Sequence, residues 1–309
     1  MGIIKDSFVA DKLLELPFLW NSDKHTAFLE KRLKVSVVFR GGELVIKGEE
    51  KKVKDALEYF NRLETVVASG YSVKDSGFEQ FFELLCSNGS IKPITIKNRH
   101  IFPKTVNQSE YLNKIRNSSI VMGIGPSGTG KTYLTVAMAV ESLLSGAVQR
   151  IILARPAVEA GESLGYLPGD LSEKINPYLR PLYDALYDMI GPEKVERYIE
   201  NGKIEIAPLA YMRGRTLNRS FAILDEAQNS SVTQMKMFLT RLGFGSKMVI
   251  TGDITQVDLP EPKKSGLLIS AKILEGIDKN IKIVRFNSAD IVRNPLVSKI
   301  IDAYEKQKD

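Results

Sequence analysis

A glycine-rich segment near the middle of the chain contains residue types that could bind phosphate. Residues 125–132 read Gly-Pro-Ser-Gly-Thr-Gly-Lys-Thr, which matches the spacing G-x-x-x-x-G-K-S/T. Glycines allow successive backbone N–H groups to turn toward phosphate oxygens, and a helix that begins there adds its positive dipole. We expect the Lys131 ammonium to lie on the β- and γ-phosphates of a nucleotide and the Thr132 hydroxyl on Mg²⁺. The other expected nucleotide contacts are Gly125, Pro126, Ser127, Gly128, Thr129 and Gly130.

Two carboxylates at the end of an apolar run could complete this chemistry. Residues 221–224 are Phe-Ala-Ile-Leu, and Asp225 and Glu226 follow at once. Asp225 could hold the Mg²⁺ through water, and Glu226 could act as the general base on an attacking water. An acidic pair that caps a helix is the alternative. The next helix, however, is expected to begin at Ser231, where Gln234 completes a capping-box spacing, so both carboxylates should lie in a loop.

Two later segments could complete the site. Residues 251–256 read Thr-Gly-Asp-Ile-Thr-Gln after an apolar run. Gln256 could orient the attacking water and Asp253 could link to the Mg²⁺ shell, although an ordinary turn is the alternative. Arg293 precedes Asn294 and Pro295, a pair that suits the start of a helix. An arginine there could point into the nucleotide site, or it could be a solvated surface residue.

The elements around these motifs predict a parallel sheet. Six short apolar runs alternate with helical stretches, the clearest of which is residues 132–144. The runs are residues 120–124, 151–154, 203–208, 221–224, 247–251 and 281–286. Such strands are typical of a sheet that is covered by helices on both faces. The expected fold class is therefore α/β, with a mostly parallel sheet over residues 111–309.

The first part of the chain predicts a smaller α+β domain. Residues 24–68 predict a helix, then a hairpin whose turn is Arg40-Gly41-Gly42-Glu43, and then a second helix. The two glycines favour the tight turn of the hairpin. We assign residues 1–68 to this domain. Residues 69–110 are less regular, with one helix expected over residues 75–86, and we interpret them as a connecting arm.

Composition limits the class of protein. The chain has 309 residues, of which 43% are hydrophobic and 26% charged, values typical of globular proteins. One cysteine, Cys86, excludes an internal disulfide, and we find neither a signal peptide nor an apolar run of about 20 residues. We therefore expect a cytoplasmic protein with no membrane segment. The 43 basic and 37 acidic residues leave a net charge of +6, which suits an anionic partner.

The motifs together resemble the PhoH family of cytoplasmic ATPases, over about residues 100–305. The stretches that carry the resemblance are residues 123–134, 155–171, 211–217, 223–229, 251–256 and 290–297. The resemblance implies a RecA-like P-loop NTPase domain that hydrolyses ATP with Mg²⁺. It also implies a role around single-stranded RNA, helicase-like or in rRNA maturation or RNA turnover, with an endoribonuclease as a possible partner.

The resemblance also implies roles for individual residues. Gln108 would read the adenine edge, and Tyr111 would stack on the adenine ring. Arg155, Arg213 and Arg215 would face nucleic acid or a neighbouring subunit, although plain surface arginines are the alternative. The sequence departs from the family pattern at two positions, where Asn107 replaces a glycine and Asn294 replaces a histidine.

The N-terminal domain resembles the KH-like module that precedes this ATPase in many members of the family. KH domains clamp nucleic acid with a glycine-containing GXXG loop. The corresponding position, residues 20–23, reads Trp-Asn-Ser-Asp and contains no glycine. RNA binding and a role in assembly therefore both stay open for this domain.

Three functions are compatible with these motifs. An RNA-associated ATPase is the leading hypothesis, and a P-loop kinase for a small molecule or a non-catalytic ATP-dependent RNA-binding scaffold are the alternatives. Full ATPase speed requires an arginine over the γ-phosphate. Because one RecA-like domain uses up residues 111–309, we expect this arginine to be Arg293 or, across a subunit interface, Arg213 or Arg215. A repeating head-to-tail contact of this kind predicts a homo-oligomer, such as a hexamer.

Overall fold

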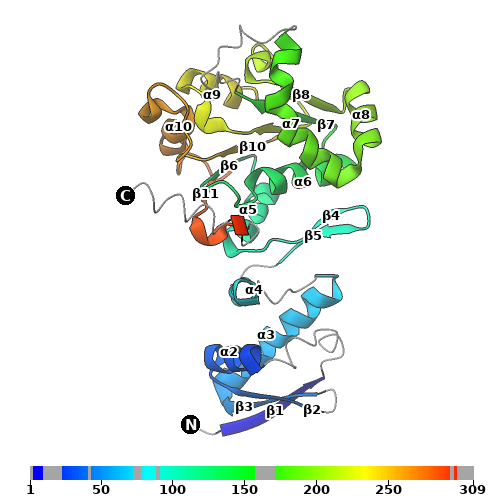
Figure 1. The fold of residues 1–309 in the computed structure, drawn as a ribbon, viewed down its shortest axis with the longest axis vertical. Coiled ribbons are helices and arrows are strands. Elements are labelled where there is room, and N and C mark those ends of the chain that lie inside the picture. The colour runs from blue at the N-terminus through cyan, green and yellow to red at the C-terminus, as the bar shows by residue number, and fades with distance from the viewer. Residues whose placement is uncertain are drawn as a thin grey trace. The chain divides into compact units, whose positions relative to one another are not determined.

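The computed structural model describes two compact units (Figure 1). The described residues are 3–9, 23–40, 43–71, 78–87, 91–156, 171–292 and 296–297. The first unit comprises residues 1–93 with 104–106, and the second comprises residues 94–103 with 107–309. The segment 69–110, which the sequence suggests as a connecting arm, is thus divided between the two units.

The first unit is a three-stranded antiparallel sheet with helices. Its elements are β1 (Ile3–Val9), α2 (Asp23–Leu33), β2 (Ser36–Arg40), β3 (Glu43–Glu49), α3 (Glu50–Ala68) and α4 (Phe78–Cys86). The strand order is β1-β3-β2, with β3 paired to both neighbours. The hairpin predicted from the glycine turn is confirmed, whereas β1 was not predicted from the sequence.

Helix α4 belongs to the core of this first unit. The Phe82 ring lies 5.0 Å from the Tyr59 ring of α3, measured between centroids. Arg62 of α3 also donates to the Leu85 carbonyl at 3.2 Å. The aromatic side chains of α4 therefore pack against α3 and close the core of this unit.

The second unit contains a six-stranded sheet in which every neighbouring pair is parallel. Its strands are β6 (Ile120–Ile124), β7 (Arg150–Arg155), β8 (Ile204–Pro208), β9 (Ser220–Leu224), β10 (Lys247–Gly252) and β11 (Ile281–Arg285). Their order is β11-β6-β10-β9-β7-β8. All six predicted strands and the predicted parallel α/β fold are confirmed.

Both faces of this sheet are buried, because alternate residues of each strand enter different cores. Val121 of β6 packs with the helices of one face, whereas Ile120 and Met122 pack with the other. The first face is covered by α5 (Val106–Asn117), α6 (Lys131–Leu144), α7 (Leu171–Ile190) and α8 (Pro192–Glu200). The second is covered by α9 (Val232–Leu239) and α10 (Gly266–Leu274), as Figure 1 shows.

Short elements complete the second unit. The hairpin of β4 (Ile94–Ile96) and β5 (Arg99–Ile101) contributes its buried residues to the same core as α6. Two 3₁₀ turns follow β8 and β9, namely η4 (Leu209–Met212) and η5 (Ala227–Asn229). Within the described part of the chain, no helix combines the length and the apolar character that a bilayer span requires.

Candidate nucleotide site

The glycine-rich loop joins the end of β6 to the start of α6, as the sequence predicts. Gly128 and Gly130 have φ angles of 83° and 80°, a left-handed conformation that glycine adopts without steric cost. Gly125 is required for a different reason, because a Cβ there would lie 2.6 Å from Cβ of Phe286. The loop is therefore shaped by its own glycines and by the segment that follows β11.

The Lys131 side chain lies within the loop. Its ammonium donates to the carbonyls of Gly125 and Pro126, each at 2.7 Å, and approaches the Thr129 hydroxyl at 3.2 Å. The residue is only 7% exposed. A buried ammonium enclosed by the loop is placed to neutralise phosphate charge there.

The ends of two strands and the start of one helix meet at Asp225. It follows β9, and its Oδ1 accepts hydrogen bonds from Thr132 Oγ1 at 2.7 Å and from Thr251 Oγ1 at 2.6 Å. Thr251 belongs to β10, so the first helical turn of α6 and two strands converge on one carboxylate. These hydroxyl and carboxylate oxygens suit a hard cation such as Mg²⁺. Thr132 and Asp225, the two residues predicted to hold Mg²⁺, are thus in direct contact.

Glu226 lies beside this cluster in an unusual backbone conformation. Its φ of 51° is left-handed, which is uncommon for a residue with a side chain. Its Oε1 is 3.2 Å from Nη2 of Arg155, and its Oε2 accepts a hydrogen bond from Gln228 Nε2 at 2.5 Å. Both carboxylate oxygens are therefore held by donors from the chain itself.

Gln228 links the acidic segment to the segment after β10. Its Nε2 also donates to the Gln256 carbonyl at 3.1 Å, and its Oε1 accepts from the Asp253 amide at 3.0 Å. Asp253 in turn accepts from the Ser127 amide of the glycine-rich loop at 2.8 Å. A continuous set of hydrogen bonds thus connects the loop, Glu226 and the segment 251–256.

The sequence of residues 100–305 matches the family described as PhoH-like protein. The chain is also 48% identical over 303 residues to the PhoH-like protein of Bacillus subtilis, which covers 94% of each chain. This chain belongs to the PhoH-like protein family. It is 49% identical over 304 residues to a PhoH-like protein of Mycobacterium bovis, covering 96% of this chain and 86% of that protein. A PhoH-like protein of Synechocystis sp. is 44% identical over 298 residues, covering 94% and 90%.

The chain belongs to this family, and its glycine-rich loop joins β6 to α6. The second unit of this PhoH-like chain therefore has a P-loop NTPase fold. The predicted capping box is also present, since Gln234 N–H donates to Ser231 Oγ and the Gln234 side chain accepts from the Ser231 amide. Helix α9 therefore starts only after the acidic segment, which leaves Asp225 and Glu226 in the connecting loop at the ends of the strands. Parallel α/β sheets bind ligands at this edge.

Tyr111 lies in a position that differs from the one expected for adenine stacking, and the adenine contact of Gln108 stays a prediction. Tyr111 is fully buried, its hydroxyl is 2.7 Å from Thr135 Oγ1, and its ring occupies the space that a Cβ on Gly123 would need. A ring buried in this way has no free face on which an adenine could stack. Tyr111 instead packs against α6 and supports it. Gln108 donates to the Thr129 carbonyl at 3.0 Å and therefore contacts the phosphate-binding loop.

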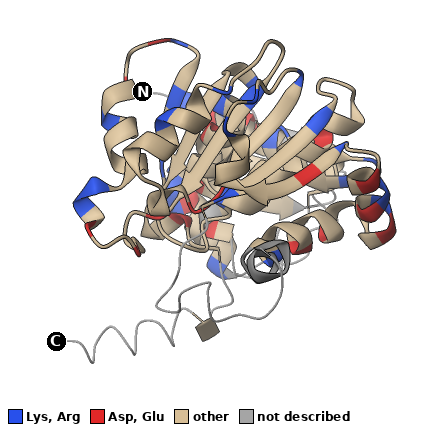
Figure 2. Ribbon diagram, turned by 90° about the horizontal axis from the view of Figure 1, so that it is seen from above, with Lys and Arg blue, Asp and Glu red and all other residues tan. Residues whose placement is uncertain are grey.

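The arginines predicted to contact nucleic acid lie in three different environments. Arg155 faces Glu226, as described above, and Arg215 forms a bidentate pair with Glu205, with Nη2 2.7 Å from Oε2. Arg213 is exposed next to Tyr211, which is 52% exposed. Figure 2 shows Lys and Arg residues interspersed with Asp and Glu along the ribbon. Of the predicted nucleic-acid residues, Arg213 is therefore the most accessible.

Of the remaining predicted site residues, one contributes only its backbone and others lie outside the described residues. Gln256 has an exposed side chain and joins the site through its backbone carbonyl. Arg293 and residues 157–170 lie outside the described residues, as do residues 20–22 of the KH-like prediction. Gln228 and Thr251 were not assigned a role from the sequence. Thr251 is a polar residue near the end of an apolar strand, and Gln228 lies four residues after another, so their places near strand ends were the available signal.

Proposed function

We propose that this PhoH-like protein binds ATP with Mg²⁺ and hydrolyses it to ADP and phosphate. The observation that carries the proposal is the hydrogen bond from Thr132 to Asp225, immediately next to the buried ammonium of Lys131. Thr132 and Asp225 would hold the Mg²⁺, directly or through water. The bound ion would neutralise negative charge on the transferred phosphate.

The chain's own residues supply the remaining functions. Lys131 would exchange the carbonyl oxygens of Gly125 and Pro126 for phosphate oxygens, so that its ammonium keeps its hydrogen bonds when the nucleotide binds. Glu226 would accept a proton from the attacking water. Arg155 and Gln228 hold its two oxygens, so they act as positioning residues for this base.

A single assay separates the candidate functions. Phosphate release is measured with ATP alone, with ATP and single-stranded RNA, and with ATP and candidate small-molecule acceptors. An RNA-associated ATPase releases phosphate with ATP and responds to RNA. A kinase would transfer the phosphate to an acceptor, and a scaffold would bind ATP without turnover. We favour the ATPase because a lysine, a metal-type carboxylate and a candidate base lie together.

Association with single-stranded RNA is the second part of the proposal. It rests on the family resemblance, on the net charge of +6 and on the exposed Tyr211 and Arg213, which combine a stacking ring with a cation. Both residues lie at or just after η4, which follows the edge strand β8. Helicase-like activity and a role in RNA processing are finer forms of the same proposal.

RNA binding should show two separable contributions. Wild-type affinity is expected to fall with salt, and Arg213→Gln should lower the log–log salt slope by about 1 because one phosphate contact is lost. Tyr211→Ala should instead cost about 1–3 kcal/mol with an unchanged slope, since stacking releases no counterions. Fluorescence anisotropy with a single-stranded oligoribonucleotide measures both effects.

A matched control for this experiment is Lys279→Gln. Lys279 is exposed in the turn before β11, at the opposite edge of the sheet, and its replacement removes the same charge. It should leave the affinity close to that of the wild type. If Arg213→Gln and Lys279→Gln behave alike, the RNA-binding surface does not include Arg213.

We further propose that the protein is a homo-oligomer, most simply a hexameric ring. A neighbouring subunit could then supply the arginine that acts on the γ-phosphate. Arg213 is better suited to act across an interface than Arg215, because the Arg215 guanidinium is already paired with Glu205. Arg293 is the candidate within the subunit.

The assembly proposal predicts that specific ATPase activity falls on dilution. Loss of a trans-acting arginine slows hydrolysis by about 10³–10⁵-fold in other NTPases. Light scattering and ATPase rates over one dilution series measure mass and activity together. A monomer with constant specific activity would remove the ring and leave the arginine within the same subunit.

A further inference from the structure

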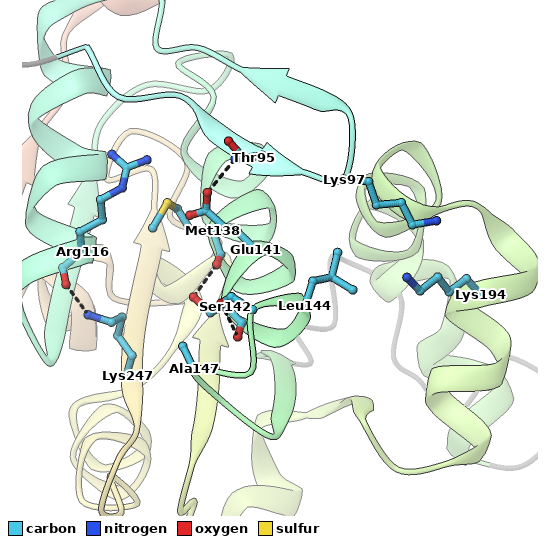
Figure 3. Close-up of a pocket in the computed structure, with 11 residues that line it drawn as sticks. Thr95, Lys97, Arg116, Met138, Glu141, Ser142, Leu144, Ala147, Lys194 and Lys247 are labelled. Atoms are coloured by element: carbon cyan, nitrogen blue, oxygen red, sulfur yellow. Dashed lines mark hydrogen bonds between the residues drawn. The ribbon is translucent and has the colours of Figure 1, made fainter. Parts of the chain in front are cut away.

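A pocket of about 810 Å³ lies at the far end of α6 from the phosphate-binding loop (Figure 3). Helix α6 begins with Lys131 at that loop, whereas its residues Met138 to Leu144 line the pocket. Met138 is the lining residue of α6 nearest to the loop, and it lies seven residues, or roughly 10 Å along the helix, from Lys131, so the pocket is separate from the candidate nucleotide site. The described residues that line it are Thr95, Lys97, Arg116, Met138, Glu141, Ser142, Leu144, Ser145, Ala147, Lys194 and Lys247.

The charges around this pocket are strongly unbalanced. Four of the residues that line it are basic, and Glu141 is the one acidic residue among those described. Glu141 Oε1 already accepts a hydrogen bond from the Thr95 amide at 2.6 Å. The lining therefore has a surplus of positive charge, which an anionic ligand would balance.

Two of the four cations, Arg116 and Lys247, are half-buried against the rest of the unit. Lys247 donates to the carbonyls of Ile115 and Ser118 at 2.5 and 2.8 Å and so caps the C-terminal end of α5. Burial lowers the pKa of both Lys247 and Arg116, although the negative charge of Glu141 acts in the opposite direction on Arg116. An anion in the pocket would favour the charged form of each group.

The other two cations, Lys97 and Lys194, are drawn on the opposite side of the pocket from Arg116 and Lys247 in Figure 3. Lys194 also lies over the Tyr198 ring, with its Nζ 5.2 Å from the centroid. Among the residues that the structure describes, no carboxylate forms an ion pair with either lysine. Two ammonium groups that line one pocket repel one another, and an anion in the pocket would be attracted to both and would reduce that repulsion.

The elements that carry these two lysines are firmly held. Lys97 is the turn residue of the β4–β5 hairpin, with a left-handed φ of 54°. The hairpin is tied to α6 through the Thr95–Glu141 bond and to α7 through Arg99, which pairs with Asp188 at 3.0 Å. Lys194 lies in the first turn of α8. The backbone that carries both lysines is therefore set before any ligand binds, which lowers part of the entropy cost of binding.

We propose that this pocket binds the phosphate groups of a nucleotide-sized ligand, at a site distinct from the phosphate-binding loop. Its volume lies in the range of about 300–1,000 Å³ that is usual for small-molecule sites. The hydroxyls of Thr95, Ser142 and Ser145 and the apolar side chains of Met138 and Leu144 provide surface for the rest of the ligand. The phosphate could belong to a free phosphorylated metabolite or to a nucleotide within an RNA strand.

The test measures binding of labelled inorganic pyrophosphate to the full chain by equilibrium dialysis at low ionic strength. All chains in this test, including the one with the wild-type pocket, carry Lys131→Ala, which removes the ammonium of the phosphate-binding loop, so that pyrophosphate reports the second site. The chain with the wild-type pocket should bind one equivalent, and Lys97→Gln combined with Lys194→Gln should weaken binding by about tenfold or more. Glu141→Gln should strengthen binding, because it removes a negative charge while its side-chain oxygen can still accept from Thr95.

Lys236→Gln combined with Lys272→Gln is the matched control. These exposed lysines of α9 and α10 lie on the other face of the sheet, and their removal changes the net charge equally. Displacement of the label by AMP identifies a free nucleotide as the source, whereas displacement by an oligoribonucleotide alone identifies RNA. The proposal is overturned if the chain with the wild-type pocket binds no pyrophosphate, or if both double variants bind it equally. Neither readout depends on ATP hydrolysis.

Discussion

Lys131→Ala is expected to abolish measurable ATP hydrolysis. The Lys131 ammonium is enclosed by the loop, with Gly125 and Pro126 carbonyls at 2.7 Å, where a nucleotide would place its phosphates. Charge stabilisation at such a position accounts for much of the rate in phosphoryl transfer, and removal of one preorganised donor typically costs about 10²–10³-fold. Phosphate release by the purified variant, at saturating ATP and Mg²⁺, measures the effect.

Two controls make this first result interpretable. Lys236→Ala removes an exposed lysine from α9 and should keep the wild-type rate. Thermal unfolding of Lys131→Ala shows whether loss of its hydrogen bonds to the loop has disturbed the fold. Wild-type turnover by a folded Lys131→Ala variant would falsify the assignment of this loop as the nucleotide site.

Glu226→Gln is expected to keep nucleotide binding while hydrolysis slows by about 10²–10⁴-fold, the usual contribution of a general base. Glutamine has the same shape and can still accept the Gln228 hydrogen bond, but it cannot take a proton from water. The positively charged Arg155 would also lose its ion pair with this position. Single-turnover hydrolysis and the equilibrium affinity for ATP are measured on the same preparation.

Asp225→Asn provides the comparison for this second result. Asp225 accepts hydrogen bonds from Thr132 and Thr251, so its replacement should weaken Mg²⁺-dependent nucleotide binding as well as the rate. The two adjacent carboxylates should therefore give different patterns. If Glu226→Gln instead loses affinity in parallel with rate, Glu226 has a structural role and another group activates the water.

The strands and the phosphate-binding loop could be predicted because their signals are local. A strand buried on both faces must be apolar along its whole length, so the run of residues 120–124 could be recognised without any knowledge of its neighbours. The loop is similar, since its glycines are needed for backbone angles that few other residues adopt. The capping box at Ser231 and Gln234 is also a contact between residues three positions apart.

Strand β1 shows where local signals were insufficient. Ile3–Val9 forms a strand by pairing along its length with β3, about forty residues later in the chain. Three of its seven residues, Lys5, Asp6 and Ser7, are polar, which weakens the strand pattern. Its formation depends on the edge that β3 offers, and the sequence of β1 alone does not describe that edge.

The sequence by itself determined the chemistry of the candidate site: the loop lysine, the hydroxyl next to it and the two carboxylates after an apolar strand. Tertiary structure decided which of these groups touch and what supports them. The Tyr111 ring is buried against β6 because that strand has a glycine, Gly123, where the ring lies, and its hydroxyl contacts Thr135 of α6. Gln228 joins Glu226 to Asp253, and Arg155 reaches Glu226 from a separate strand. Contacts of this kind depend on the order of strands in the sheet, which brings distant segments together and leaves no periodic trace in the sequence.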